Sequence, residues 1–191
     1  MKPLLSRIRA CTICEAHLPL GSRPVLKADP TSKIVIIGQA PGTVVHETGI
    51  PWNDKSGERL REWLEVDLTT FYDPEQFAII PMGFCYPGKG LSGDLPPRKE
   101  CAPTWHDLLW QELKEVQLTL LVGAYAQSYY LHKRRGRTLT ETVKNFSRYL
   151  PDFFPLPHPS PRNNIWLKKN KWFEAEVIPE LRHRVKRAIR N

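Results

Sequence analysis

Three short apolar runs, each ending in glycine, constrain the fold of this chain more than any other feature. They are "KIVIIG" (33–38), "FAIIPMG" (77–83) and "LTLLVG" (118–123), and "DFFPLP" (152–157) is a weaker fourth run that proline interrupts. Runs rich in β-branched residues without polar alternation are typical of strands buried on both faces of a parallel sheet. The stretches between them carry apolar residues at helical spacing. Strands that alternate with helices predict an α/β fold with helices on both faces of a parallel sheet.

Length and charge narrow the function classes. With 191 residues and no clear linker, we expect one domain over residues 1–191. The formal net charge is +8, and its excess lies late, in "KRRGR" (133–137), "KKNK" (168–171) and a basic C-terminal helix ending in "RHRVKRAIRN". This distribution favours a polyanionic partner such as nucleic acid. No apolar run is long enough to span a membrane, and we expect a cytoplasmic protein without an export signal.

The four cysteines form a second pattern. Cys11 and Cys14 make a C-x2-C pair, and Cys85 and Cys101 follow with fifteen residues between them. A C-x2-C turn brings two thiolates to one metal centre, and a distant pair can complete four-coordination. Zinc and an iron–sulfur cluster both accept four thiolates, so the spacing leaves both open.

The loops that follow the predicted strands are the candidate functional segments, because ligands bind at the carboxyl ends of strands in such sheets. After the first strand, "GQAPG" (38–42) leads to Trp52 and Asp54, just ahead of a helix that starts near Ser56. Asp54 could equally be the N-terminal cap of that helix. After the fourth strand, "LPHPSPRNN" (156–164) alternates three prolines around a histidine and a serine. Proline fixes φ and removes a donor, so this segment is predicted to be a stiff, extended loop.

Taken together, these motifs resemble the uracil-DNA glycosylase superfamily, most closely its iron–sulfur branches, families 4 and 5. "GQAPG" resembles the first motif of those branches, and "HPSPRN" resembles the second motif of the superfamily, particularly in the single-strand-selective monofunctional branch. The cysteine spacing resembles that of the family 4 cluster ligands. The resemblance covers residues from about 11 to 165. It implies a three-layer α/β/α sandwich around a four-stranded parallel sheet, and a 4Fe–4S cluster on the four cysteines, with zinc as the alternative.

The same resemblance implies an activity and residue roles. The activity is hydrolysis of the bond between deoxyribose and uracil or another deaminated base in DNA, by a monofunctional enzyme of base excision repair that we expect to be a monomer. His158 would stabilise the departing base and Asp54 the sugar cation, as the catalytic pair. The substrate-binding residues would be Gln39, Ala40, Trp52, Ser160 and Arg162. Among them, Trp52 would stack on the base, Ser160 would contact phosphate and Arg162 would enter the vacated stack.

The chain departs from the family pattern on the second strand. Many members carry a base-reading Asn there, whereas "IIPMGF" places Pro81 or Met82 at that position. Ala40 also stands where another branch has a catalytic Asp. Loss of a bidentate amide weakens strict selection of one base. A non-catalytic protein that binds DNA lesions, with the same fold and cluster, is therefore the alternative function.

Overall fold

The computed structural model describes residues 1–190, and its centre is a four-stranded parallel sheet. The strands are β1 (Ile34–Ile37), β2 (Phe77–Ile79), β5 (Leu118–Val122) and β6 (Phe154–Leu156), in the order β2-β1-β5-β6. Every residue of these four strands is buried, as the sequence predicted for strands covered on both faces. The predicted α/β sandwich is confirmed.

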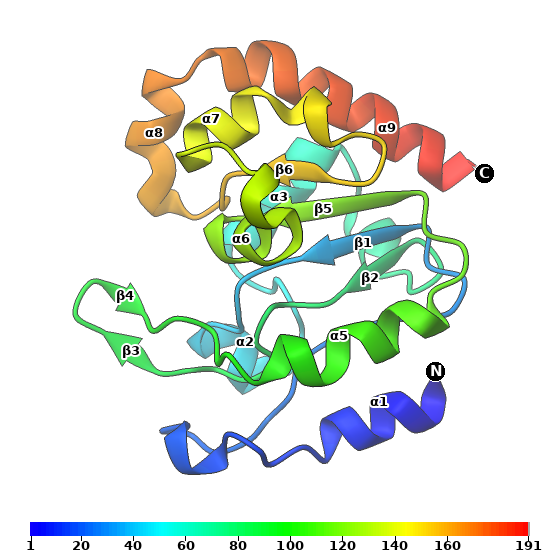
Figure 1. Ribbon diagram of the computed structural model, residues 1–191, viewed down its shortest axis with the longest axis vertical. Helices are drawn as coiled ribbons and strands as arrows, with labels where there is room; N and C mark the ends of the chain where they lie inside the picture. Colours follow the sequence, from blue (N-terminus) through cyan, green and yellow to red (C-terminus); the bar gives the residue numbers. More distant parts are fainter. Residues whose placement is uncertain (191) are drawn as a thin grey trace.

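Helices cover both faces of the sheet (Figure 1). On one face, α1 (Lys2–Arg9), α5 (Cys101–Glu112) and α6 (Ala124–Leu131) pack with Val35 and Ile37. On the other face, α3 (Lys55–Leu64), α7 (Leu139–Lys144) and α9 (Ile178–Arg190) pack with Ile34 and Ile36. Alternate β1 residues thus enter two separate cores, because successive side chains of a strand point to opposite faces.

Shorter elements connect this frame. They are η1 (Glu15–His17), α2 (Thr43–Thr48), α4 (Leu68–Phe71), β3 (Lys89–Gly90), β4 (Gly93–Asp94), η2 (His132–Arg134), η3 (Phe146–Tyr149), η4 (Pro161–Asn163), α8 (Asn164–Lys169) and the π-helical turn η5 (Phe173–Val177). Strands β3 and β4 form an antiparallel hairpin that projects from the body of the molecule (Figure 1). The C-terminal helical region is interrupted at Asn170–Lys171, and the π-helical turn η5 runs directly into α9 just ahead of Pro179.

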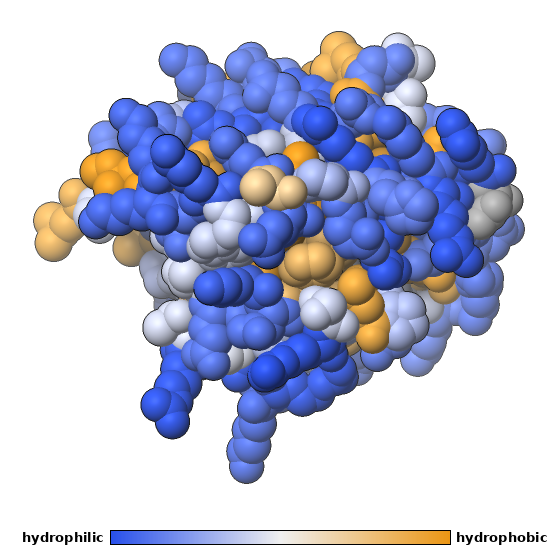
Figure 2. All heavy atoms as spheres, turned by 90° about the horizontal axis from the view of Figure 1, so that it is seen from above, coloured by the Kyte–Doolittle hydropathy of each residue, from blue (hydrophilic) through white to orange (hydrophobic). Residues whose placement is uncertain are grey.

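The C-terminal helix is both apolar and basic. Leu181, Val185 and Ala188 are buried against the core shared with α3. Its cations are largely engaged: Arg182 donates to the carbonyl oxygens of Glu62 (2.9 Å) and Trp63 (3.3 Å) at the end of α3. Arg184 pairs with Glu180 at 2.7 Å, and Lys186 pairs with Glu65. The view from above shows a face that is mainly hydrophilic, with small apolar areas (Figure 2).

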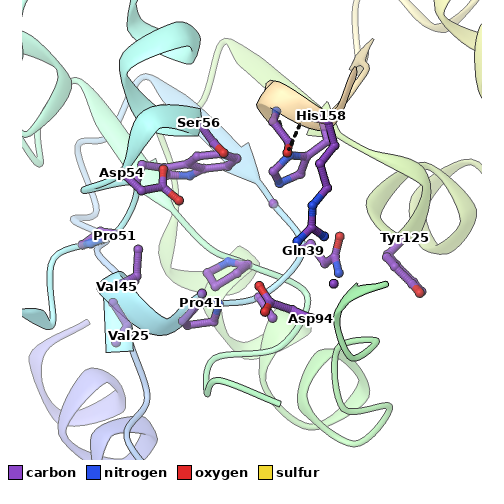
Figure 3. Close-up of a pocket in the computed structure, with 18 of the residues that line it drawn as sticks. Val25, Gln39, Pro41, Val45, Pro51, Asp54, Ser56, Asp94, Tyr125 and His158 are labelled. Atoms are coloured by element: carbon purple, nitrogen blue, oxygen red, sulfur yellow. Dashed lines mark hydrogen bonds between the residues drawn. The ribbon is translucent and has the colours of Figure 1, made fainter. Parts of the chain in front are cut away.

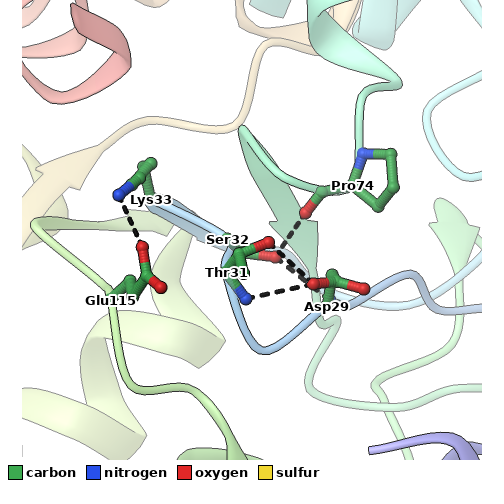
Figure 4. Close-up of polar contacts among 6 residues, drawn as sticks. All are labelled: Asp29, Thr31, Ser32, Lys33, Pro74 and Glu115. Carbon is green, nitrogen blue, oxygen red and sulfur yellow. Dashed lines mark hydrogen bonds and ion pairs between the residues drawn. The ribbon is translucent and has the colours of Figure 1, made fainter. Parts of the chain in front are cut away.

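Polar contacts hold the amino-terminal ends of the strands in place (Figure 4). Asp29 accepts from the Thr31 amide (3.1 Å) and hydroxyl (2.7 Å), and these bonds lower its pKa. Ser32 donates to the Pro74 carbonyl at 2.6 Å, ahead of β2. Lys33 pairs with Glu115 at 2.6 Å, ahead of β5. Three strands are thereby held at one end, which leaves the other end for the loops.

Within residues 1–190, no helix combines the length and apolar character needed to cross a bilayer.

A buried histidine on α5 makes the stability of the fold depend on pH. His106 lies with Nδ1 2.6 Å from the Tyr130 hydroxyl and Nε2 3.1 Å from the Pro81 carbonyl. Burial lowers its pKa from 6.5 to about 4. As the pH falls, the unfolded chain therefore binds this proton first, and folding stability drops between pH 6.5 and 4.

We expect His106 to account for about 3 kcal/mol of that loss. Above pH 6.5 its contribution to stability is complete. Urea unfolding of the protein and of the His106→Gln variant at pH 7 and pH 4.5 will measure the difference. An equal loss in both proteins would show that other groups cause the acid sensitivity.

Candidate active site

A cavity of about 490 Å³ lies at the carboxyl ends of the strands and is drawn in Figure 3. Much of its lining comes from the loop after β1, the loop before α3, the β3–β4 hairpin and the loop after β6. All seven residues predicted for catalysis or base binding line it: Gln39, Ala40, Trp52, Asp54, His158, Ser160 and Arg162. Segments far apart in the sequence therefore meet at one place, as the topology of a parallel sheet requires.

The loop after β1 is held by the loop after β2. The Met82 amide donates to the Gly38 carbonyl and the Gly83 amide to the Gln39 carbonyl, both at 3.0 Å. These bonds continue the strand pairing beyond the sheet and fix the backbone of the "GQAPG" segment. Gln39 and Ala40 are thereby presented at the cavity wall.

The loop after β6 sets the hydrogen-bonding state of His158. The Ser160 amide donates to His158 Nδ1 at 3.2 Å, so Nδ1 is the acceptor and Nε2 carries the hydrogen. Burial lowers the pKa of His158, although nearby Asp54 opposes this shift. The ring is therefore neutral at pH 7 and has a donor at Nε2. The Asn163 amide group, which donates to the His158 carbonyl at 2.7 Å, further fixes the loop.

Asp54 has two roles in one carboxylate. Its Oδ1 accepts from the Gly57 amide at 2.8 Å and caps α3, as one interpretation of the sequence proposed. Within residues 1–190, its second oxygen makes no hydrogen bond to the protein, and the side chain faces the cavity from the wall opposite Gln39 (Figure 3). The cap orients the carboxylate and leaves one oxygen available to a ligand.

Trp52 lies against the backbone of two glycines. A Cβ on Gly57 would lie 1.7 Å from the Trp52 carbonyl oxygen, and a Cβ on Gly38 would lie 3.0 Å from the indole ring. Trp52 itself has φ of 57°, in the left-handed region that a non-glycine residue rarely adopts. Its ring centroid is 5.5 Å from that of His158. Such strained residues cluster at functional sites, and here the strain brings an aromatic face beside the histidine.

Arg162 connects the two sides of the cavity mouth. Its Nη1 donates to the Ser92 carbonyl at 3.1 Å, and a Cβ on Gly93 would lie 2.0 Å from that nitrogen. The Ser160 hydroxyl accepts from the Arg162 amide at 3.3 Å and so caps the short helix η4. The roles of Ser160 on phosphate and of Arg162 in the base stack stay predictions.

The structure adds residues that sequence analysis missed. The hairpin brings Asp94 to the cavity, and α6 brings Tyr125. The glycine-rich turn "GKGLSGD" after the second strand is a hairpin signal and could have indicated that this segment returns toward the sheet edge.

The base-reading position of the second strand is apolar. Pro81 lines the cavity, and Met82 is buried in the core on the α5 side. Proline has no amide hydrogen, and its carbonyl is engaged by His106 at 3.1 Å. This position therefore offers the cavity no bidentate amide.

The four cysteines line a second, smaller cavity between the N-terminal segment, the loop after β2 and the start of α5. All four are free thiols, and Cys14, Cys85 and Cys101 are buried. Burial raises the pKa of Cys85 to about 11 and that of Cys101 to about 12, while the backbone amides of Arg23 and Phe84 act in the opposite direction. Uncharged buried thiols are inert as nucleophiles, and they would bind a metal only after losing their protons.

The four cysteines are candidate metal ligands because they share one cavity. Within residues 1–190, no group of three or more Cys, His, Asp or Glu side chains is arranged to hold a metal ion. Thiolates on one zinc would lie about 3.8 Å apart, given a Zn–S bond of about 2.3 Å. The four sulfurs are nevertheless contributed by separate segments that meet at one cavity.

Comparisons with known proteins point to one family. A sequence model of the uracil DNA glycosylase superfamily matches residues 27–182, which include both walls of the candidate active site. A type-4 uracil-DNA glycosylase of Thermotoga maritima is 26% identical over 136 residues, covering 71% of this chain and 68% of that protein.

Proposed function

Because the chain belongs to the uracil-DNA glycosylase superfamily, we propose that it hydrolyses the N-glycosidic bond of uracil or another deaminated base in DNA. The observation that carries this proposal is the pairing of a neutral His158, with its hydrogen on Nε2, and an available Asp54 oxygen in one cavity beside Trp52. The relative's name gives the same reaction for that protein.

The cavity supplies each requirement of the reaction. The target base must leave the duplex stack, at a cost of a few kcal/mol. Stacking on Trp52 returns about 1–3 kcal/mol of that cost. When the bond between the base nitrogen and the sugar carbon breaks, its electron pair stays on the base. Nε2–H of His158 then donates to the base carbonyl that gains negative charge, while the Asp54 carboxylate stabilises the sugar cation and orients the water that adds to it.

The proposed range of substrates follows from Pro81. A site without a bidentate amide at the second strand discriminates less strongly between bases that differ in their hydrogen-bonding edge. Gln39 keeps one amide donor and one acceptor at the cavity wall. We therefore include hypoxanthine and xanthine, the deaminated purines, beside uracil.

The proposed cofactor is a 4Fe–4S cluster held by Cys11, Cys14, Cys85 and Cys101. When bound, it would cross-link the N-terminal segment to the loop after β2 and to α5. No step of the base excision is assigned to it. We further propose that the protein acts on DNA as a monomer in the cytoplasm.

The test uses oligonucleotides that carry one uracil, hypoxanthine or xanthine, each in single-stranded and duplex form. Incubation with protein of known iron content, followed by alkali, should produce strand breaks at the modified position of at least one substrate. An absence of breaks, together with tight binding to the same oligonucleotides, would replace this proposal with the non-catalytic lesion-binding function. The apolar position at Pro81 is the observation that favours that alternative.

A further inference from the structure

Two buried hydrogen-bond donors near the cysteines have no partner in the protein. Within residues 1–190, four buried side-chain polar atoms lack a hydrogen bond: Ser22 Oγ, His46 Nδ1, Gln76 Oε1 and Arg98 Nε. Ser22 and Arg98 both line the cavity that the four cysteines share. Buried polar groups are almost always satisfied, so two orphans at one cavity call for an acceptor inside it.

The chemistry of the two orphans identifies that acceptor. Arg98 Nε can only donate, and the guanidinium is held in place because its Nη2 donates to Glu100 Oε1 at 2.6 Å. The Ser22 hydroxyl donates as readily as it accepts. Apart from them, the cavity is lined by apolar side chains and the sulfurs of the four cysteines. Sulfur is thus the acceptor available to both donors.

The backbone around the cavity follows the same pattern. The backbone amides of Arg23 and Phe84 donate to the sulfurs of Cys85 and Cys101, respectively. Cys14 Sγ donates to Glu100 Oε2 at 3.8 Å, and the other oxygen of that carboxylate holds the Arg98 guanidinium beside the cavity. Donors therefore surround the sulfur atoms from several segments, an environment suited to an anionic group of thiolates and inorganic sulfides.

We propose that Ser22 and Arg98 donate hydrogen bonds to sulfur atoms of the bound iron–sulfur cluster and stabilise its more reduced, more negative states. The inference rests on the cluster assignment in the proposed function. Hydrogen bonds to cluster sulfurs raise the reduction potential, because they stabilise the form with the extra electron. The same bonds make the resting cluster harder to oxidise and hence slower to break down.

The experiment compares the holoprotein with Ser22→Ala, Arg98→Met and Arg98→Lys, purified without oxygen. Ser147→Ala and Arg148→Met are matched controls, since both residues are exposed on η3 and neither lines the cysteine cavity. Iron and acid-labile sulfide per chain, the midpoint potential by voltammetry and the half-time of bleaching by ferricyanide are measured. None of these readouts depends on base excision.

With cluster content equal to that of the unaltered protein, Ser22→Ala and Arg98→Met should shift the midpoint potential to more negative values and shorten the bleaching half-time several-fold. Arg98→Lys keeps the charge without the Nε–H donor and should behave like Arg98→Met. Unchanged potentials and half-times at full cluster content would overturn the donor assignment and leave the cluster intact. An Arg98→Lys variant that matches the unaltered protein would assign the effect of Arg98 to its charge and overturn its hydrogen bond.

Two further outcomes distinguish the role of the Ser22 hydroxyl from the cluster assignment and from the proposed activity. If Ser22→Ala fails to retain the cluster, Ser22→Thr retains the hydroxyl and should restore both the iron content and the potential; equal loss in both variants would refute the role of the hydroxyl. If the unaltered protein contains zinc and no sulfide, the cluster assignment itself is wrong and this inference ends with it. Base excision by such a zinc protein would still support the proposed activity.

Discussion

The Asp54→Asn variant will excise bases at a rate lower by about 10²-fold or more, with little change in folding stability. Asn is as good an N-cap as Asp, so the bond from the Gly57 amide and the start of α3 are kept. What the substitution removes is the negative charge beside the sugar cation. Single-turnover excision from the best substrate of the panel, with urea unfolding of the same preparation, measures both effects.

Asp67 provides a matched control for this experiment. It caps α4 through a bond from the Thr70 amide at 2.7 Å, and it does not line the active-site cavity. Asp67→Asn should keep full activity. If Asp54→Asn also excises bases at the unaltered rate, Asp54 is only a helix cap and the proposed mechanism loses its carboxylate.

The His158→Ala variant will lose about 10²–10³-fold in the rate of base excision, because the departing base loses its hydrogen-bond donor. Exposed His183 on α9 is the control position, and His183→Ala should be fully active. The unaltered protein should keep its rate to below pH 6.5, since burial lowers the pKa of His158 from that value and the bond from the Ser160 amide requires the neutral ring.

A change of leaving group separates this role from a structural one. Fluorine at carbon 5 of uracil stabilises the departing anion, so the penalty of His158→Ala should shrink with that substrate. A penalty of equal size for uracil and its fluorinated form would indicate that His158 only shapes the loop.

The sheet could be predicted from sequence because its strands are buried on both faces. Continuous β-branched runs such as Ile34–Ile37 have few alternatives to a central parallel strand, and their order along the chain limits the topology. The ends of the strands did not follow from the apolar runs alone. The second run was predicted through Gly83, whereas β2 ends at Ile79, although the Ile80 and Met82 amides still donate to β1 and the loop that follows it.

The candidate site was predicted where a motif lies directly after a strand. His158 and Gln39 follow β6 and β1 closely, and the topology alone brings them together. Asp94 could not be placed in this way, because its position depends on how the hairpin folds back and on the bond from Arg162 to Ser92. The conformation of Trp52 also depends on Gly57, because a side chain at that position would collide with the Trp52 backbone.

The partners of the C-terminal cations affect how the affinity for DNA depends on salt concentration. Each protein cation that neutralises a DNA phosphate releases counterions, and the logarithm of affinity falls with the logarithm of salt by about 0.9 per such contact. Arg182, Arg184 and Lys186 already have carbonyl or carboxylate partners on α3 and α9. The basic run at the end of the chain therefore contributes fewer released counterions than its charge suggests, and affinity for DNA should decline with salt less steeply than a count of its arginines and lysines implies.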